Sequence, residues 1–175
     1  GDALRVLAPA DFPQLDFQRV DTSTLGMDRI ANAAAAYALA GRAAVIVDCG
    51  TAITLEAVDA AGRFMGGAIL PGRMLARRSL AAYTAQLPML PLQQQRPAAL
   101  GRCTREAMEA GMDLGAVGAV QYLLEQCRLE MGAADALCLA VGGDAPFFCD
   151  NVPGLIPGPQ YLTLRGAACS QASAD

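Results

Sequence analysis

The residue group with the clearest chemical potential begins at Asp48, which ends the apolar run 43–48 and precedes Gly50 and Thr51. A glycine turn after a buried strand exposes backbone N–H groups that can meet phosphate oxygens, and a carboxylate at the end of the strand can hold a cation. A structural alternative is an ordinary hairpin in which the aspartate accepts hydrogen bonds from the turn amides. The motif therefore predicts a phosphate or cation site, with an ordinary hairpin as the alternative.

A second acid stands near the start of an Ala-rich segment that predicts a helix over 28–40. Asp28 follows Gly26 and Met27 and precedes Arg29. A carboxylate base beside an arginine that clamps an anionic substrate fits this arrangement. An acid in the first turn of a helix is also favoured by capping and by the helix dipole, so a structural role stays open.

Three further segments combine glycines, a proline or a hydroxyl. Residues 66–72 contain three glycines and a proline, which suits either the close approach of a ligand or a bulged strand and turn. Thr84 follows the predicted helix 73–83, where its hydroxyl can bind a ligand or stop the helix. Gly142 and Gly143 follow an apolar run and can face a ligand or form a simple turn.

The composition narrows the chemistry that these residues can perform. The 175 residues include no His and no Lys, and all 13 positive charges are Arg. This excludes, within the chain, a Ser-His-Asp or Cys-His site, a Schiff-base lysine and a phosphate-loop lysine. Carboxylates, backbone amides, hydroxyls and arginines are left, and phosphate or small-acid chemistry suits that set.

Charge and cysteine usage limit the partners and the location that we expect. The net charge of −4 argues against nucleic acid or an anionic membrane as the main partner. No apolar run reaches the roughly 18 residues of a membrane helix. The six cysteines form no CxxC pair, so we expect reduced thiols in a cytoplasmic protein rather than a zinc site or disulfides.

The order of the predicted elements indicates how the candidate residues are positioned. Before the helix 28–40 we expect short strands 4–7 and 15–20. After it we expect, in chain order, strands 43–48, 52–58 and 63–70, helices 73–83 and 104–131, strand 136–141, helix 145–150 and strand 161–164. Three consecutive antiparallel strands followed by alternating helices and strands are typical of a ribonuclease H-like lobe with a mixed α/β sheet, as in actin-like ATPases. We expect this lobe over 26–169, after linker strands or the end of a preceding lobe over 1–25, and before a tail over 170–175.

The motifs also follow one another in a distinctive order. They are Gly-x-Asp-Arg from Gly26, Asp-x-Gly-Thr-Ala-x-Thr from Asp48, Gly-Gly-x-Ile-x-Pro-Gly from Gly66, Thr-Ala-x-Leu-Pro from Thr84, Gly-x-x-Thr from Gly101 and Gly-Gly-Asp from Gly142. This series resembles the type III pantothenate kinase family of the actin-like ATPase superfamily. The resemblance implies ATP-dependent phosphorylation of pantothenate to 4′-phosphopantothenate, the first step of coenzyme A biosynthesis.

The resemblance implies roles on the substrate side. Asp28 would be the general base that takes the proton from the primary hydroxyl of pantothenate. Gly26, Met27 and Arg29 would line the pantothenate site, with Arg29 near the substrate carboxylate. Thr84 would reach pantothenate near the interface of a homodimer.

On the nucleotide side, the resemblance implies that ATP arrives with Mg²⁺ and that its phosphates meet Gly50 and Thr51. Gly142 and Gly143 would face the adenosine. Asp48 would bind the monovalent cation, potassium or ammonium, that the family uses.

Departures from the family pattern leave alternatives open. The family's Asp-x-Gly-Asn-Thr phosphate loop does not occur, so we expect either part of a longer two-lobed kinase, inactive alone, or a shortened binding or regulatory relative. Arg19 stands where the family commonly places a Tyr against pantothenate, which motivates a kinase for another hydroxy acid, and Glu56 stands where the family often has Asp. The small-residue stripe of Gly111, Gly115 and Gly118 predicts homodimerisation.

Overall fold

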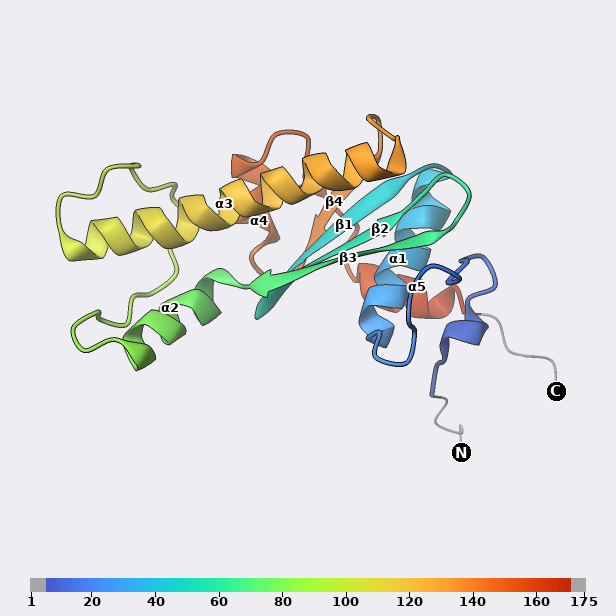
Figure 1. The fold of residues 1–175 in the computed structure, drawn as a ribbon, viewed down its shortest axis with the longest axis horizontal. Helices are drawn as coiled ribbons and strands as arrows, with labels where there is room; N and C mark the ends of the chain where they lie inside the picture. The colour runs from blue at the N-terminus through green and yellow to red at the C-terminus, as the bar shows by residue number, and fades with distance from the viewer. Residues whose placement is uncertain (1–5, 171–175) are drawn as a thin grey trace.

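The computed structural model describes residues 6–170, whose strands form a five-stranded sheet in the order β3-β2-β1-β4-β5 (Figure 1). The strands are β1 (Ala44–Cys49), β2 (Ala52–Val58), β3 (Phe64–Pro71), β4 (Leu137–Val141) and β5 (Ile156–Pro157). β1, β2 and β3 pair antiparallel, whereas β4 pairs parallel with β1, and β5 pairs parallel with β4. The predicted mixed sheet with three consecutive antiparallel strands is therefore confirmed.

Helices cover both faces of this sheet. One face packs against α1 (Met27–Ala40) and α5 (Leu162–Ala168), and the other packs against α3 (Thr104–Met131) and α4 (Ala145–Asn151). Coverage on both faces explains the continuous apolar run of β1, in which Val45, Ile46 and Val47 are fully buried. Because side chains alternate along a strand, Ile46 packs under α1 and α5, while Val45 and Val47 pack under α3 and α4.

The small side chains of α1 allow α5 to approach it closely. A Cβ at Gly166 of α5 would overlap the carbonyl oxygen of Ala31, so this contact requires glycine. α1 ends at Gly41, whose φ of 58° lies in the left-handed region, and the predicted glycine stop is confirmed. The close contact with α5 holds α1 firmly on the sheet.

α2 (Arg73–Tyr83) and the first turns of α3 extend beyond the sheet (Figure 1). Gly111, Gly115 and Gly118 lie exposed on α3, and a Cβ at each would meet no described atom within 4 Å. The stripe therefore packs against no helix of the described chain, and homodimerisation through it stays a prediction. Within residues 6–170, no helix is both long enough and apolar enough to cross a bilayer.

The predicted strand over 161–164 is wrong. These residues begin α5, and the fifth strand is the two-residue β5 before them. Leu162 and Gly166 are one helical turn apart, and both are buried on the side that faces α1. The alternation of apolar and polar residues over four positions resembled a strand, but the closer packing of a helix against α1 prevails.

The predicted strand over 15–20 is also wrong. This segment forms turns and contacts the sheet through an isolated bridge between Asp16 and Arg63. Leu15 is buried instead in an apolar cluster with Phe12 beneath α1. The predicted strand 4–7 lies partly outside the described residues, and its described part has no regular structure.

None of the six cysteines forms a disulfide in the structure, and their reduced state in a cytoplasmic protein stays a prediction. Cys49 and Cys138 are buried, and Cys103 is exposed. Burial raises the pKa of the Cys49 thiol well above its usual range. This buried sulfur is therefore protonated and inert at neutral pH.

Candidate functional site

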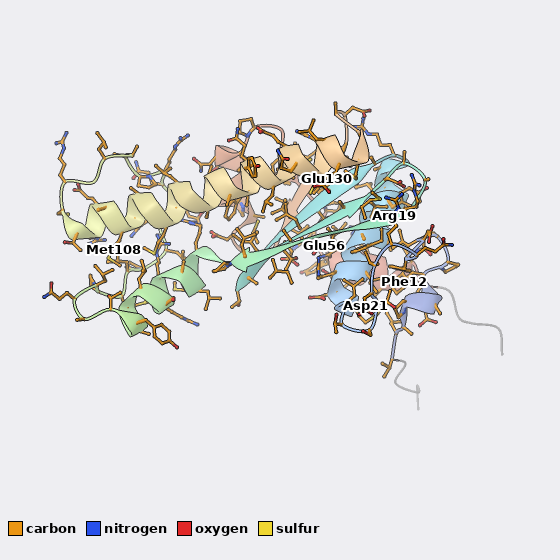
Figure 2. The ribbon with its side chains drawn as sticks, viewed as in Figure 1. Phe12, Arg19, Asp21, Glu56, Met108 and Glu130 are labelled. Atoms are coloured by element: carbon orange, nitrogen blue, oxygen red, sulfur yellow. The ribbon has the colours of Figure 1, made fainter. Side chains whose placement is uncertain are left out.

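Polar side chains interrupt the otherwise apolar sheet face beneath α1. The pairing of β1 with β2 places Asp48 opposite Thr54, and Ile46 opposite Glu56. Directly paired side chains lie on the same face of a sheet, so Asp48, Thr54 and Glu56 share the face that α1 covers. Figure 2 shows Glu56 in this part of the molecule, far from Met108 on α3.

The first two turns of α1 carry the partners of these strand residues. Asp28, Arg29 and Asn32 lie on one side of the helix, because residues four apart are neighbours on its surface. Asp28 is exposed, Arg29 is half-buried and Asn32 is buried. The series runs from solvent into the protein, with a carboxylate at the surface and an amide in the interior.

Arg29 forms a partly buried ion pair with Glu56. Its Nε donates to Glu56 Oε1 at 2.8 Å, and a terminal nitrogen donates to the carbonyl oxygen of Leu55 at 3.3 Å. Glu56 is fully buried, and its Oε2 has no hydrogen-bond partner among the described residues. Burial raises the pKa of Glu56 to about 7, against the opposing effect of the hydrogen bond from Arg29. A buried acid of this kind beside an accessible arginine is a candidate for function.

Gly67 of β3 makes room for this ion pair. β3 places Gly67 opposite Glu56. A Cβ at Gly67 would overlap the carbonyl oxygen of Leu55 and would lie 3.0 Å from a terminal nitrogen of Arg29. The group that approaches the glycine pair is therefore part of the chain itself rather than a ligand.

Asn32 connects Asp48 with α5. Its amide nitrogen donates to Asp48 Oδ2 at 3.3 Å, and its amide oxygen accepts a hydrogen bond from the Thr163 hydroxyl at 2.7 Å. An ionised carboxylate only accepts hydrogen bonds, so Asp48 determines which end of the amide faces it, whereas the Thr163 hydroxyl can donate or accept. Burial raises the pKa of Asp48, the hydrogen bond from Asn32 lowers it, and the charge of Asp28 raises it. Asp28 and Asp48 are therefore close enough for their charges to interact. We call Asp28, Arg29, Asp48 and Glu56 the α1 cluster.

The start of α1 leaves the Asp28 carboxylate accessible. Gly26 is the N-cap residue, and a Cβ there would lie 2.5 Å from Asp28 Oδ1. The same oxygen accepts a hydrogen bond from the backbone N–H of Arg29 at 2.9 Å, which is the local role that the sequence left open. Met27 is half-buried and packs against the apolar cluster beneath the helix. Asp28 thus combines a local hydrogen bond with exposure to solvent.

The carboxyl ends of β1 and β4 meet at one edge of the sheet, because the two strands are parallel. Gly142 has a φ of 90° there, and a Cβ on it would lie 2.7 Å from both Asp48 Oδ1 and the carbonyl oxygen of Cys49. Oxygen ligands of this kind suit a hard cation, and a single carboxylate supplies the charge for a monovalent one. Over residues 6–170, no group of three or more Cys, Asp and Glu side chains is placed to hold a metal ion.

A cavity of about 550 Å³ opens at this edge. Asp48, Gly142 and Thr163 lie in its lining, together with apolar residues of β4 and α4. This volume falls in the range of small-molecule sites. Gly143, which the sequence also placed at the nucleotide, is exposed beside the cavity but is not part of its lining.

The turn between β1 and β2 lies outside this lining and contains Gly50 and Thr51, both exposed. The N–H of Gly50 donates to the carbonyl oxygen of Ala52 at 3.0 Å, and the carbonyl oxygen of Thr51 accepts from the N–H of Gly72 at 2.9 Å. The Gly50 amide is already engaged within the turn. The contact of Gly50 and Thr51 with ATP phosphates, which the resemblance implies, stays a prediction.

Two residues singled out for the substrate do not join the α1 cluster within this chain. Thr84 is exposed at the end of α2, remote from α1 in Figure 1, and its hydroxyl donates to the carbonyl oxygen of Leu80 at 2.7 Å. Arg19 is exposed and lies toward the β2–β3 hairpin, apart from Glu56 (Figure 2).

A second charged cluster, which the sequence did not predict, joins α2, α3 and the turn before α4. Arg73 donates to Asp113 Oδ1 at 2.9 Å and to Asp144 Oδ1 at 2.8 Å, and its guanidinium carbon lies 3.4 Å from the ring centre of Phe147. Arg77 donates to Asp113 Oδ2 at 3.0 Å. We call Arg73, Arg77, Asp113 and Asp144 the α2–α3 ion network; its first three members are fully buried.

Two members of the site were missed by sequence reasoning. Asn32 was not singled out, and Glu56 was noted only as a departure from a pattern. A signal existed for both. Asn32 is a polar residue one turn after Asp28 in an Ala-rich helix, and Glu56 alternates with Thr54 in an apolar strand.

Comparisons with known proteins agree with the motif order. The model of the family described as type III pantothenate kinase matches residues 3–126. The type III pantothenate kinase of Rubrobacter xylanophilus is 36% identical and aligns with 94% of this chain and 66% of its own length. That of Treponema pallidum is 40% identical, with 82% and 52% covered. The chain thus spans about half to two thirds of the length of these curated relatives.

A solved structure is similar as well. A Campylobacter jejuni protein described as a Baf family transcriptional activator aligns with a TM-score of 0.62 and 28% identity, over 90% of this chain and 68% of that chain. The family model covers well over half of the chain. The chain therefore belongs to the type III pantothenate kinase family.

Proposed function

We propose that this chain supplies the pantothenate site and the catalytic base of an ATP-dependent pantothenate kinase. The observation that carries the proposal is the juxtaposition, on the first turn of α1, of the exposed Asp28 carboxylate and the Arg29 guanidinium. A base beside a carboxylate-binding cation suits a substrate that has both a hydroxyl and a carboxylate. Pantothenate is such a substrate, and family membership supports the choice.

The reaction follows from these two groups. Arg29 binds the substrate carboxylate, and Asp28 takes the proton from the primary hydroxyl as its oxygen attacks the γ-phosphorus of ATP. The new P–O bond forms, the bond between the γ-phosphorus and ADP breaks, and the products are 4′-phosphopantothenate and ADP. Such a transfer depends on positioning and charge stabilisation more than on covalent catalysis, which suits a chain without His or Lys.

The nucleotide side of the proposal uses the edge where β1 and β4 end. Asp48 and the carbonyl oxygen of Cys49 would hold potassium or ammonium. Gly142 would border the adenosine in the cavity, with Gly143 beside it, and Thr51 would meet the phosphates. Mg²⁺ would arrive with ATP and offset the charge of its phosphates. Thr84 would reach pantothenate at the interface of a homodimer.

The test is Asp28→Asn in a coupled assay of ADP formation, with and without pantothenate, on this chain and on any longer protein that contains it. We expect turnover to fall by about 10²- to 10⁴-fold, because the base is lost, while the melting temperature is unchanged. The control is Asp135→Asn, which removes an exposed acid paired with Arg42 on the surface. Near-normal turnover of Asp28→Asn would contradict the role of this residue.

A second candidate is a binding or regulatory protein that keeps the pantothenate site without turnover. The similarity to the Campylobacter protein described as a transcriptional activator favours it. Pantothenate binding without ADP formation, by this chain and by any longer protein that contains it, would support this candidate. A kinase for another hydroxy acid would phosphorylate that acid faster than pantothenate in the same assay.

A further inference from the structure

The α1 cluster has an unequal charge balance. Arg29 is its one cation, and Asp28, Asp48 and Glu56 are its acids. The groups that act on Glu56 are Arg29 from α1, Asp48 from β1 and the Thr54 hydroxyl on its own strand. From β3, the residue opposite Glu56 is Gly67, which brings no side chain. A substrate anion that enters this cluster therefore meets three acids and one cation.

The geometry fixes where that anion can bind. Arg29 is held from the protein side, by Glu56 at its Nε and by the Leu55 carbonyl at a terminal nitrogen. Its side chain keeps 17% of its surface exposed, whereas that of Glu56 is fully buried. The absence of a side chain at Gly67 leaves the space that the guanidinium occupies, since a Cβ there would lie 3.0 Å from a terminal nitrogen of Arg29. A substrate carboxylate therefore approaches the open side of the same guanidinium that Glu56 contacts from within.

Two carboxylates on one guanidinium repel each other, and the buried one has no solvent to screen its charge. Glu56 is also the acid of the cluster whose second oxygen has no hydrogen-bond partner among the described residues. We propose that a carboxylate bound at Arg29 is taken up together with one proton, which comes from solvent and neutralises Glu56. Glu56 is thus a positioning residue that holds Arg29 in the free protein and gives up its charge when the substrate binds. This inference rests on the proposed function, because it takes pantothenate as the carboxylate.

Coupling between substrate binding and proton uptake makes the Kd for pantothenate depend on pH. Because the pKa of Glu56 is already raised to about 7 by burial, the acid is largely protonated below neutral pH, and the substrate then binds without further proton uptake. Above that pKa the proton must be acquired on binding, so the Kd for pantothenate rises by up to about tenfold per pH unit.

The experiment is a calorimetric titration of this chain with pantothenate, in buffers of different ionisation enthalpy, at several pH values around neutral. The slope of the binding enthalpy against the buffer enthalpy gives the number of protons taken up. We expect between zero and one proton per pantothenate for the wild type, rising with pH. Glu56→Gln, which resembles the protonated acid, should bind without proton uptake and with a Kd independent of pH over this range. Glu130→Gln removes an acid near the C-terminal end of α3 (Figure 2), outside the α1 cluster, and should behave like the wild type.

Each outcome decides the inference. Wild-type binding without proton uptake at pH values above the pKa of Glu56 overturns it and leaves the proposed function intact, and this result needs no variant to fold. Proton uptake that persists in Glu56→Gln assigns the proton to another acid and also overturns it. No binding of pantothenate by the wild type contradicts the proposed function itself, and the coupling with it.

Discussion

Two arginine–carboxylate clusters in this chain bury charge in opposite ways. The α2–α3 ion network matches two arginines with two aspartates and seals three of the four from solvent. The α1 cluster has one arginine among three acids, and its outer acid is exposed. The first cluster is balanced in charge, although Arg77 Nε has no hydrogen-bond partner among the described residues, whereas the second has unmatched negative charge and a partly exposed guanidinium. Charge balance therefore distinguishes the buried network that joins α2 and α3 from the cluster that we propose as the substrate site.

The comparison predicts a large loss of stability when the balanced network is broken. Asp113→Ala leaves the buried Arg73 and Arg77 without their shared acid. We expect the free energy of unfolding to fall by about 3–5 kcal/mol, because an uncompensated buried charge is costly. Urea unfolding followed by circular dichroism measures this change.

The matched control is Glu109→Ala, whose partner Arg105 is mostly exposed on the same helix. Its loss should cost at most about 1 kcal/mol, since surface ion pairs contribute little. An Asp113→Ala variant as stable as this control would show that the network holds nothing together.

Gly67→Ala tests how tightly the α1 cluster is built. The added Cβ would overlap the Leu55 carbonyl and press on Arg29, so we expect a loss of about 1–3 kcal/mol in unfolding free energy together with weaker pantothenate binding. Gly118→Ala is the matched substitution, because its Cβ would meet no described atom within 4 Å. It should stabilise α3 by at most about 1 kcal/mol. Equal stability of the two variants would contradict the close contact at Gly67.

The pH dependence of stability tests the buried acid of the α1 cluster. The pKa of Glu56 is raised by burial from 4.5 to about 7, so the folded chain binds more protons than the unfolded chain between these values. The free energy of unfolding should therefore fall as pH rises from about 4.5 to 7, by at most about 1.4 kcal/mol per pH unit. Urea titrations across this range measure the slope, and Glu56→Gln should remove it. A slope unchanged by that substitution would assign it to other groups.

The sequence predicted the framework of the site better than its interior. The sequence placed Asp28 and Arg29 at the start of a helix and Asp48 near the end of a strand, and both elements are confirmed, because an apolar run that ends in Asp and an Ala-rich helix with an acid in its first turn are local patterns. The ion pair of Arg29 with Glu56 joins residues 27 positions apart and depends on the β1–β2 register. No local pattern reveals such a pairing.

Contacts between residues distant in the sequence were also missed elsewhere in the chain. Residues 161–164 were predicted as a strand because apolar and polar residues alternate over these four positions, and so short a pattern does not distinguish a strand from a helix. The packing of Gly166 against α1, which favours the helix, is visible only in three dimensions. The α2–α3 ion network was missed because Arg73, Asp113 and Asp144 come from three separated segments. Local propensity and motif order therefore suffice for the sheet and the helices, and tertiary pairing decides the buried charges.

The most direct test of the central claim is a titration of this chain with pantothenate, comparing the wild type with Arg29→Met. The account predicts that the wild type binds and that the Kd rises at least about tenfold in the variant, because a charge-assisted hydrogen bond to the substrate carboxylate is lost. Arg78→Met, an exposed arginine on α2, serves as the control and should bind as the wild type does. Equal affinity of the wild type and Arg29→Met, with both folded, would contradict the assignment of the α1 cluster as the pantothenate site.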